Sequence, residues 1–237
     1  MSNSKTQAAK APQQNAAQEQ TRSVYDVKIQ AVYPDGGDII ADASATYNGV
    51  FAIRGLKLAK DENGPYVAMP GYQSAKGFVE VCTPTGPDVY DQLKNAVLSA
   101  YRQSLALMRE QGIGTAQEQN PSEREQLPTS VAVKINALRN GPTLADATVE
   151  IGGTFTVNGA RIVNSENGLF VSMPSIKTDS GYMDACFPCT SEFHEKVKGV
   201  VLDGYQQSLT QFYDQTAAAA PEQTQGSVPA MGMTQTM

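Results

Sequence analysis

The sequence contains an internal repeat, in which two segments align with each other at a constant offset of 104 residues (Asn167 against Asn63, for example). The offset holds without a gap from Asp42 to Leu105. Matching pairs include Asp42 and Asp146, Asn63-Gly64 and Asn167-Gly168, Met69-Pro70 and Met173-Pro174, and Val97-Leu98 and Val201-Leu202. A register of this length is not kept by chance, and two copies are too few for a solenoid, so the repeat predicts tandem domains.

Each copy carries the pattern of an antiparallel sheet. Val27 and Ile29 in copy one, and Val131, Val133 and Ile135 in copy two, recur at every second position, as in a half-buried strand. Asn63-Gly64 and its counterpart predict a hairpin with a type I′ turn. Pro70 and Pro174 lack a backbone donor and should end the strands that follow these turns.

A helix is expected to close each copy. Apolar residues recur at steps of four and form one stripe that faces the sheet: Val89, Leu93, Val97, Tyr101 and Leu105, and then Phe193, Val197, Val201, Tyr205 and Leu209. Thr85 with Asp88, and Ser191, are the predicted helix caps. The predicted fold class is therefore α+β, with two tandem copies of a small antiparallel sheet domain and a C-terminal helix on one face of each.

Composition divides the chain into five parts. Residues 1–22 and 215–237 are rich in Gln and Ala and are predicted to be disordered tails, because they bury too little apolar surface to offset their ordering entropy. Domain one is expected at 23–110 and domain two at 129–214. Residues 111–128 read as a flexible linker.

The net charge of −6 does not favour diffuse binding along a phosphate backbone, although a local basic patch can act on an acidic protein. Three cysteines do not indicate a disulfide framework, and Cys186 and Cys189 form a C-x-x-C that we interpret as buried thiols. No apolar run reaches the ~18 residues of a membrane span. We expect a cytoplasmic protein that is not an enzyme and uses no cofactor or metal.

Copy two resembles the SpoVG family, the bacterial septation and sporulation regulators. The resemblance rests on the run from Asn167 to Ser175, on the run from Lys177 to Asp184 with Pro188 after it, and on the helix segment from Val201 to Tyr205. Copy one is similar more loosely, from Asn63 to Pro70 and from Val97 to Tyr101.

The resemblance implies a sheet domain that pairs with a second copy through its strands, so the two copies are expected to form an intrachain pseudo-dimer. It also implies a role in septation and sporulation, with DNA or RNA bound through basic residues. Carried over to this sequence, the implied phosphate-binding residues are Lys177, Lys196, Lys198, Arg161, Lys57 and Lys94.

The sequence departs from the family where the family has two adjacent basic residues. Copy two keeps one of them, at Ile176-Lys177, and copy one keeps neither, at Tyr72-Gln73. Each lost cation removes about one phosphate contact. The alternatives are therefore ordinary solvated lysines, and a protein-interaction module that keeps the fold and binds a protein partner through its sheet edges or its tails.

Overall fold

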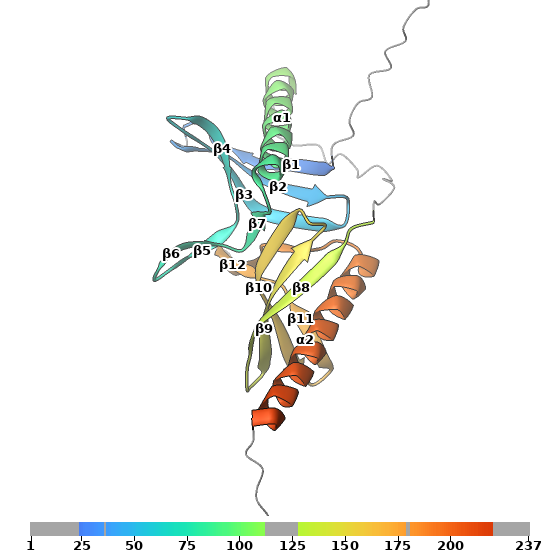
Figure 1. Ribbon diagram of the computed structural model, residues 1–237. Coiled ribbons are helices and arrows are strands. Elements are labelled where there is room, and N and C mark those ends of the chain that lie inside the picture. The colour runs from blue at the N-terminus through green and yellow to red at the C-terminus, as the bar shows by residue number, and fades with distance from the viewer. Residues whose placement is uncertain (1–23, 36, 112–127, 179–180, 220–237) are drawn as a thin grey trace, which may run out of the picture.

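The computed structural model describes residues 24–35, 37–111, 128–178 and 181–219. The predicted tail 1–22, most of the predicted linker 111–128 and the end of the chain after 219 lie outside the described residues. Figure 1 shows two sheets, one from each half of the chain, with α1 beside the first and α2 along the second. Neither described helix is long and apolar enough to cross a membrane.

The two copies contain the same elements in the same order. Copy one has β1 (Tyr25–Val32), β2 (Ile39–Tyr47), β3 (Phe51–Asp61), β4 (Gly64–Ala68), β5 (Gly71–Ser74), β6 (Gly77–Glu80), β7 (Cys82–Pro84) and α1 (Pro87–Gln111). Copy two has β8 (Val131–Leu138), β9 (Thr143–Ile151), β10 (Phe155–Ser165), β11 (Gly168–Ser172), β12 (Ser175–Thr178), β13 (Gly181–Asp184), β14 (Cys186–Pro188) and α2 (Ser191–Ala219).

Each main sheet is completed by a strand from the other copy. Strands β1, β2, β3 and β4 of copy one are joined by β14 of copy two, and β8, β9, β10 and β11 of copy two are joined by β7 of copy one. All of these pairings are antiparallel. The predicted α+β fold is confirmed, and the predicted pseudo-dimer takes the form of a reciprocal strand exchange.

A glycine marks the point where the long strand of each copy changes partner. Residues 51–53 of β3 pair with β14 of the other copy, whereas residues 57–61 pair with β4 of the same copy. Gly55 lies between these segments with a φ of +73°, a conformation that glycine adopts without steric cost. Gly159 of β10 repeats the arrangement with a φ of +87°.

The exchange follows a pseudo-twofold axis. The Arg54 amide donates to the Ala185 carbonyl at 2.7 Å, and the equivalent Asn158 amide donates to the Val81 carbonyl at 2.8 Å. Cys82 and Cys186 are equivalent buried residues whose thiols interact with each other, and because equivalent residues of a twofold pair can touch only at the axis, both lie on it.

One hydrophobic core spans both copies. The Phe155 ring of copy two contacts the Tyr25 and Tyr47 rings of copy one, with ring centroids 6.1 and 5.6 Å apart. The Tyr47 hydroxyl also lies 2.9 Å from Thr154 Oγ1. Each helix packs on its own copy's sheet, α1 mainly against β1 and α2 mainly against β8. The predicted stripes lie at these contacts, although Leu105 remains 40% exposed.

The hairpin turns differ from the predicted type I′ geometry. Asp61 pairs with Gly64, so the two loop residues are Glu62 and Asn63, and neither has a positive φ. Gly64 itself has a φ of +108°, and the equivalent Gly168 has +99°. The glycine therefore serves as the first residue of the returning strand, as in a type I turn followed by a G1 bulge.

Both predicted helix caps are wrong. The Phe193 amide donates to Thr190 Oγ1 at 3.2 Å, so Thr190 rather than Ser191 caps α2. In copy one Thr85 Oγ1 donates to the Gly153 carbonyl at 2.7 Å and so supports the contact between copies. Helix α2 also continues past Asp214, where domain two was predicted to end, to Ala219.

Candidate nucleic-acid interface

The basic residue on β3 is held by a carboxylate of the neighbouring strand. Lys57 lies opposite Asp42, and its Nζ is 3.1 Å from Asp42 Oδ1. The second oxygen of Asp42 accepts a hydrogen bond from the Tyr33 hydroxyl at 2.6 Å, which raises the pKa of Tyr33. The positive charge of Lys57 is therefore largely compensated within the protein.

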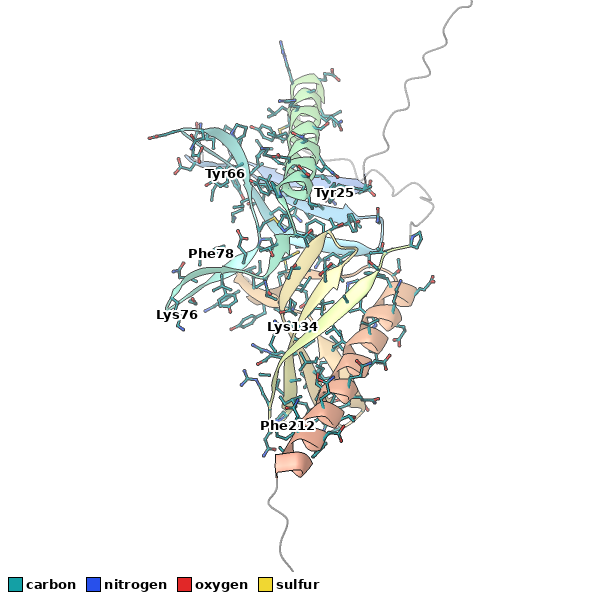
Figure 2. The ribbon with its side chains drawn as sticks, in the orientation of Figure 1. Tyr25, Tyr66, Lys76, Phe78, Lys134 and Phe212 are labelled. Atoms are coloured by element: carbon teal, nitrogen blue, oxygen red, sulfur yellow. The ribbon has the colours of Figure 1, made fainter. Side chains whose placement is uncertain are left out.

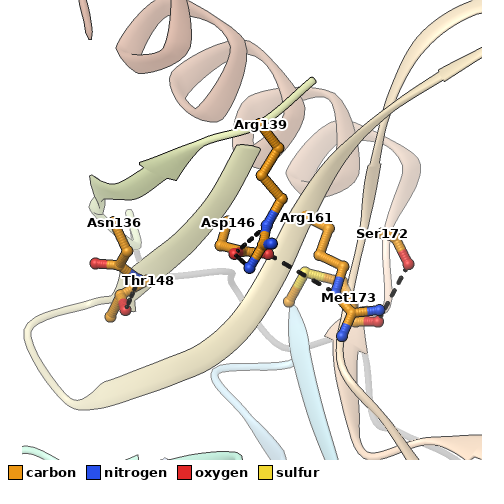
Figure 3. A network of polar contacts seen from close by, with 7 residues as sticks. All are labelled: Asn136, Arg139, Asp146, Thr148, Arg161, Ser172 and Met173. Atoms are coloured by element: carbon orange, nitrogen blue, oxygen red, sulfur yellow. Dashed lines mark hydrogen bonds and ion pairs between the residues drawn. The ribbon is translucent and has the colours of Figure 1, made fainter. Parts of the chain in front are cut away.

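Copy two builds the same arrangement with a second arginine (Figure 3). Arg161 occupies the position equivalent to Lys57, and its Nε is 4.0 Å from Asp146 Oδ1. Arg139 binds the same carboxylate, with its Nε donating to Asp146 Oδ2 at 2.6 Å. This hydrogen bond, with the charge of Asp146, raises the pKa of Arg139. Arg139 was not predicted from sequence, because it lies outside the gapless repeat.

The lysines that occupy equivalent positions on the two helices are also paired. Lys94 Nζ is 2.9 Å from Asp91 Oδ1, and Lys198 Nζ is 3.6 Å from Glu195 Oε2. In both pairs the acidic residue precedes the lysine by three positions on the same helix. The hydrogen bond to Asp91 is the main reason why the pKa of Lys94 is raised. Pairs of this kind are ordinary features of a solvated helix.

Lys196 has a structural contact. Its Nζ donates to the Thr129 carbonyl at 2.7 Å, which ties the first turns of α2 to the residues that precede β8. Thr129 is itself 5% exposed, and its hydroxyl lies 3.4 Å from Asn48 Nδ2 of copy one. Lys196 therefore supports the junction between the copies.

Lys177 is the exception among the six predicted residues. It lies on β12, is exposed, and makes no ion pair or side-chain hydrogen bond with the part of the chain that the structure describes. The nearby carboxylate of Asp184 instead accepts a hydrogen bond from Ser175 Oγ at 2.9 Å. The side chain opposite Lys177 in the hairpin is Tyr182, which is 80% exposed.

The structure does not gather the six predicted residues into one patch. Lys177 lies on the β12–β13 hairpin, which contacts β5 of copy one. Lys196 and Lys198 lie on α2, which packs against β8, β9, β11 and β14. Sequence analysis also missed Arg54, whose guanidinium carbon lies 4.4 Å from the centre of the Phe187 ring of the other copy.

The cysteines and the single histidine form no reactive cluster within the described residues. Cys82 and Cys186 are buried as predicted, but Cys189 is exposed, so the C-x-x-C is not a pair of buried thiols. The hydrogen bond with Cys186, followed by burial, raises the pKa of Cys82 well above its usual range and keeps it protonated at neutral pH. His194 Nδ1 lies 3.5 Å from Glu195 on the helix surface. The described residues contain no group of three or more metal-binding side chains.

These features define a tandem α+β protein in which two copies of one domain complete each other's sheets. A sequence model of the SpoVG family matches residues 22–103 and 129–207, one match for each copy. The chain belongs to the SpoVG family.

Individual relatives match over about the length of one copy. Three of them carry the name "Putative septation protein SpoVG". The protein of Desulforudis audaxviator is 35% identical over 79 residues, which cover 33% of this chain and 89% of the relative. The protein of Archaeoglobus fulgidus is 38% identical over 69 residues, covering 29% and 81%. That of Symbiobacterium thermophilum is 39% identical over 75 residues, covering 31% of this chain and 54% of the relative.

Proposed function

We propose that this chain is a non-enzymatic, cytoplasmic regulator of septation and sporulation that acts by binding DNA or RNA. The septation role is carried over from the name of its relatives. The observation that supports nucleic-acid binding is Lys177, an exposed lysine whose ammonium has no partner in the described structure. A phosphate is a natural ligand for such a group, because its binding costs no existing ion pair.

The other predicted residues are weaker phosphate ligands. Asp42, Asp146, Asp91 and Glu195 each lie within 4.0 Å of one of these cations, and a phosphate would have to compete with them. Binding would thus involve few phosphates and should lose affinity gently with salt, by a slope of about −0.9 per contact on duplex DNA and −0.7 on single strands.

The same neutralisation favours a second candidate function. A protein-interaction module would need no strong positive field, and its partner would dock on the exposed apolar residues or the sheet edges. Tyr182 and Phe78, which are 80% and 59% exposed, are the described side chains that suit such a role best.

A salt titration of binding tests the leading proposal. Labelled single- and double-stranded DNA and RNA would be titrated with the wild type, with Lys177→Ala and with Lys198→Ala, the matched control whose lysine is already ion-paired. We expect log affinity to fall with log salt, and the slope to decrease by about one contact in Lys177→Ala only. Absence of binding at low salt would refute the proposal and favour the protein-interaction module.

A further inference from the structure

Two hairpins stand apart from the main sheets. Strands β5 and β6 form one two-stranded sheet and β12 and β13 form another, and β5 and β12 contact each other. The two hairpins occupy equivalent positions in the repeat but come from different copies. The exchange of strands between copies thus brings both to the same part of the molecule.

One face of the β12–β13 hairpin is used for packing. Ile176 Cδ1 lies 2.9 Å, and Met183 Cε 3.9 Å, from the position that a Cβ on Gly55 would occupy. These side chains therefore cover Gly55, where β3 changes partner. Because neighbouring residues of a strand point to opposite faces, Lys177 and Tyr182 lie on the other side of the hairpin, away from this contact.

The β5–β6 hairpin presents an aromatic side chain at the equivalent position. Phe78 aligns with Tyr182 in the repeat, lies opposite Gln73, and is 59% exposed. Figure 2 labels Phe78 on this hairpin and Lys76 at its turn, and the Phe78 ring lies over Gly71 at the base of the hairpin, with its Cζ 2.6 Å from the position that a Cβ on Gly71 would occupy. Lys76 is exposed, and its side chain makes no hydrogen bond or ion pair with the described residues. Each hairpin thus combines an exposed ring with an uncompensated lysine.

We propose that these hairpins bind single-stranded nucleic acid, with unpaired bases stacked on Tyr182 and Phe78 and phosphates held by Lys177 and Lys76. This inference rests on the proposed function and assigns it a substrate class. Exposed rings can stack on bases only where the base faces are accessible, which excludes an intact duplex. Lys177, opposite Tyr182, and Lys76, at the turn of the hairpin that carries Phe78, supply the cations that the backbone next to a stacked base needs.

Fluorescence anisotropy with labelled oligo-dT and oligo-U of about 15 nucleotides, against a duplex of equal length, tests the proposal. Stacking is worth about 1–3 kcal/mol per base, so Tyr182→Ala and Phe78→Ala should each weaken single-strand binding about tenfold. Tyr182→Phe keeps a ring and should bind like the wild type. Tyr213→Ala is the matched control, since Tyr213 is 65% exposed on α2, away from the hairpins.

The outcomes separate this inference from the proposed function. If the alanine variants bind single strands as the wild type does while Lys177→Ala binds more weakly, stacking is refuted and nucleic-acid binding stands. If the wild type prefers the duplex, or if Tyr213→Ala loses as much affinity as Tyr182→Ala, the inference also fails. If the wild type binds no oligonucleotide at low salt, both proposals fail, and the hairpin rings become the first candidates for a protein-docking surface.

Discussion

The thiols of Cys82 and Cys186 meet at the pseudo-twofold axis, where each cysteine belongs to a strand that completes the sheet of the other copy. Both are fully buried. Because of this contact, the two copies form one packed unit and not two independent domains joined by a linker.

This thiol contact predicts a loss of stability in alkaline solution. The pKa of Cys82 is raised in the folded state, so the folded protein keeps a proton that the unfolded chain releases above the usual thiol pKa of 9.0. Stability is therefore complete below that pH and falls as pH rises through it, by at most about 1.4 kcal/mol per pH unit for one group. Urea denaturation across this range should show a smaller decline in Cys82→Ala than in the wild type. An equal decline in both would contradict the assignment to Cys82.

The aromatic contact between the copies predicts a large effect of one core substitution. Phe155 is fully buried against Tyr25 and Tyr47, and Phe155→Ala should cost about 3–5 kcal/mol of unfolding free energy. Thermal unfolding followed by circular dichroism should still show one transition, because the core is shared. Tyr213→Ala, at an exposed ring, should change stability by less than about 0.5 kcal/mol. Two separate transitions in the wild type would mean that the copies unfold independently.

The partner switch in β3 predicts that a side chain at position 55 destabilises the fold. An alanine at a φ of +73° costs about 1–2 kcal/mol in backbone strain, and its Cβ would also press on Ile176 Cδ1. Gly55→Ala should therefore lower the melting temperature more than Gly159→Ala, whose nearest contact is 3.8 Å away. Gly199→Ala in α2 is the control, because it has open space and no positive φ, and alanine is favoured over glycine inside a helix. Equal melting temperatures for Gly55→Ala and Gly199→Ala would count against the assigned strain.

Substitution of Lys196 is expected to change stability, and substitution of Lys177 is expected to change nucleic-acid binding. Lys196→Ala removes the hydrogen bond to the Thr129 carbonyl and should cost about 1 kcal/mol in unfolding free energy, with little change in nucleic-acid affinity. Lys177→Ala should leave stability unchanged and weaken binding. Denaturation and fluorescence anisotropy on the same preparations measure stability and nucleic-acid affinity. A loss of affinity in Lys196→Ala together with a loss of stability in Lys177→Ala would contradict both assignments.

The repeat, the α+β class and the helix stripes were predictable because long periodic segments carry a strong local signal. Strands β7 and β14 were not, since three residues are too few to show alternation. The sequence also could not predict which copy each of these strands pairs with, because equivalent strands of the two copies have the same local pattern. Lys177 was identified from a resemblance, but the lack of an ion pair at its side chain within the described residues is a tertiary property. The exposure of Phe78 and Tyr182 is a tertiary property, although the aromatic match at one offset was visible in the sequence.

The sharing of strands between the copies is tested most directly by the mass of copy two on its own. Residues 128–219 contain β10 and β14 but lack their partners β7 and β3. We therefore predict that this fragment forms a homodimer, in which β14 of each protomer pairs with β10 of the other, as a closed twofold interface requires. Sedimentation equilibrium should give twice the fragment's mass at micromolar concentration, with the circular dichroism of a folded α+β protein. A folded, stable monomer would contradict the exchange.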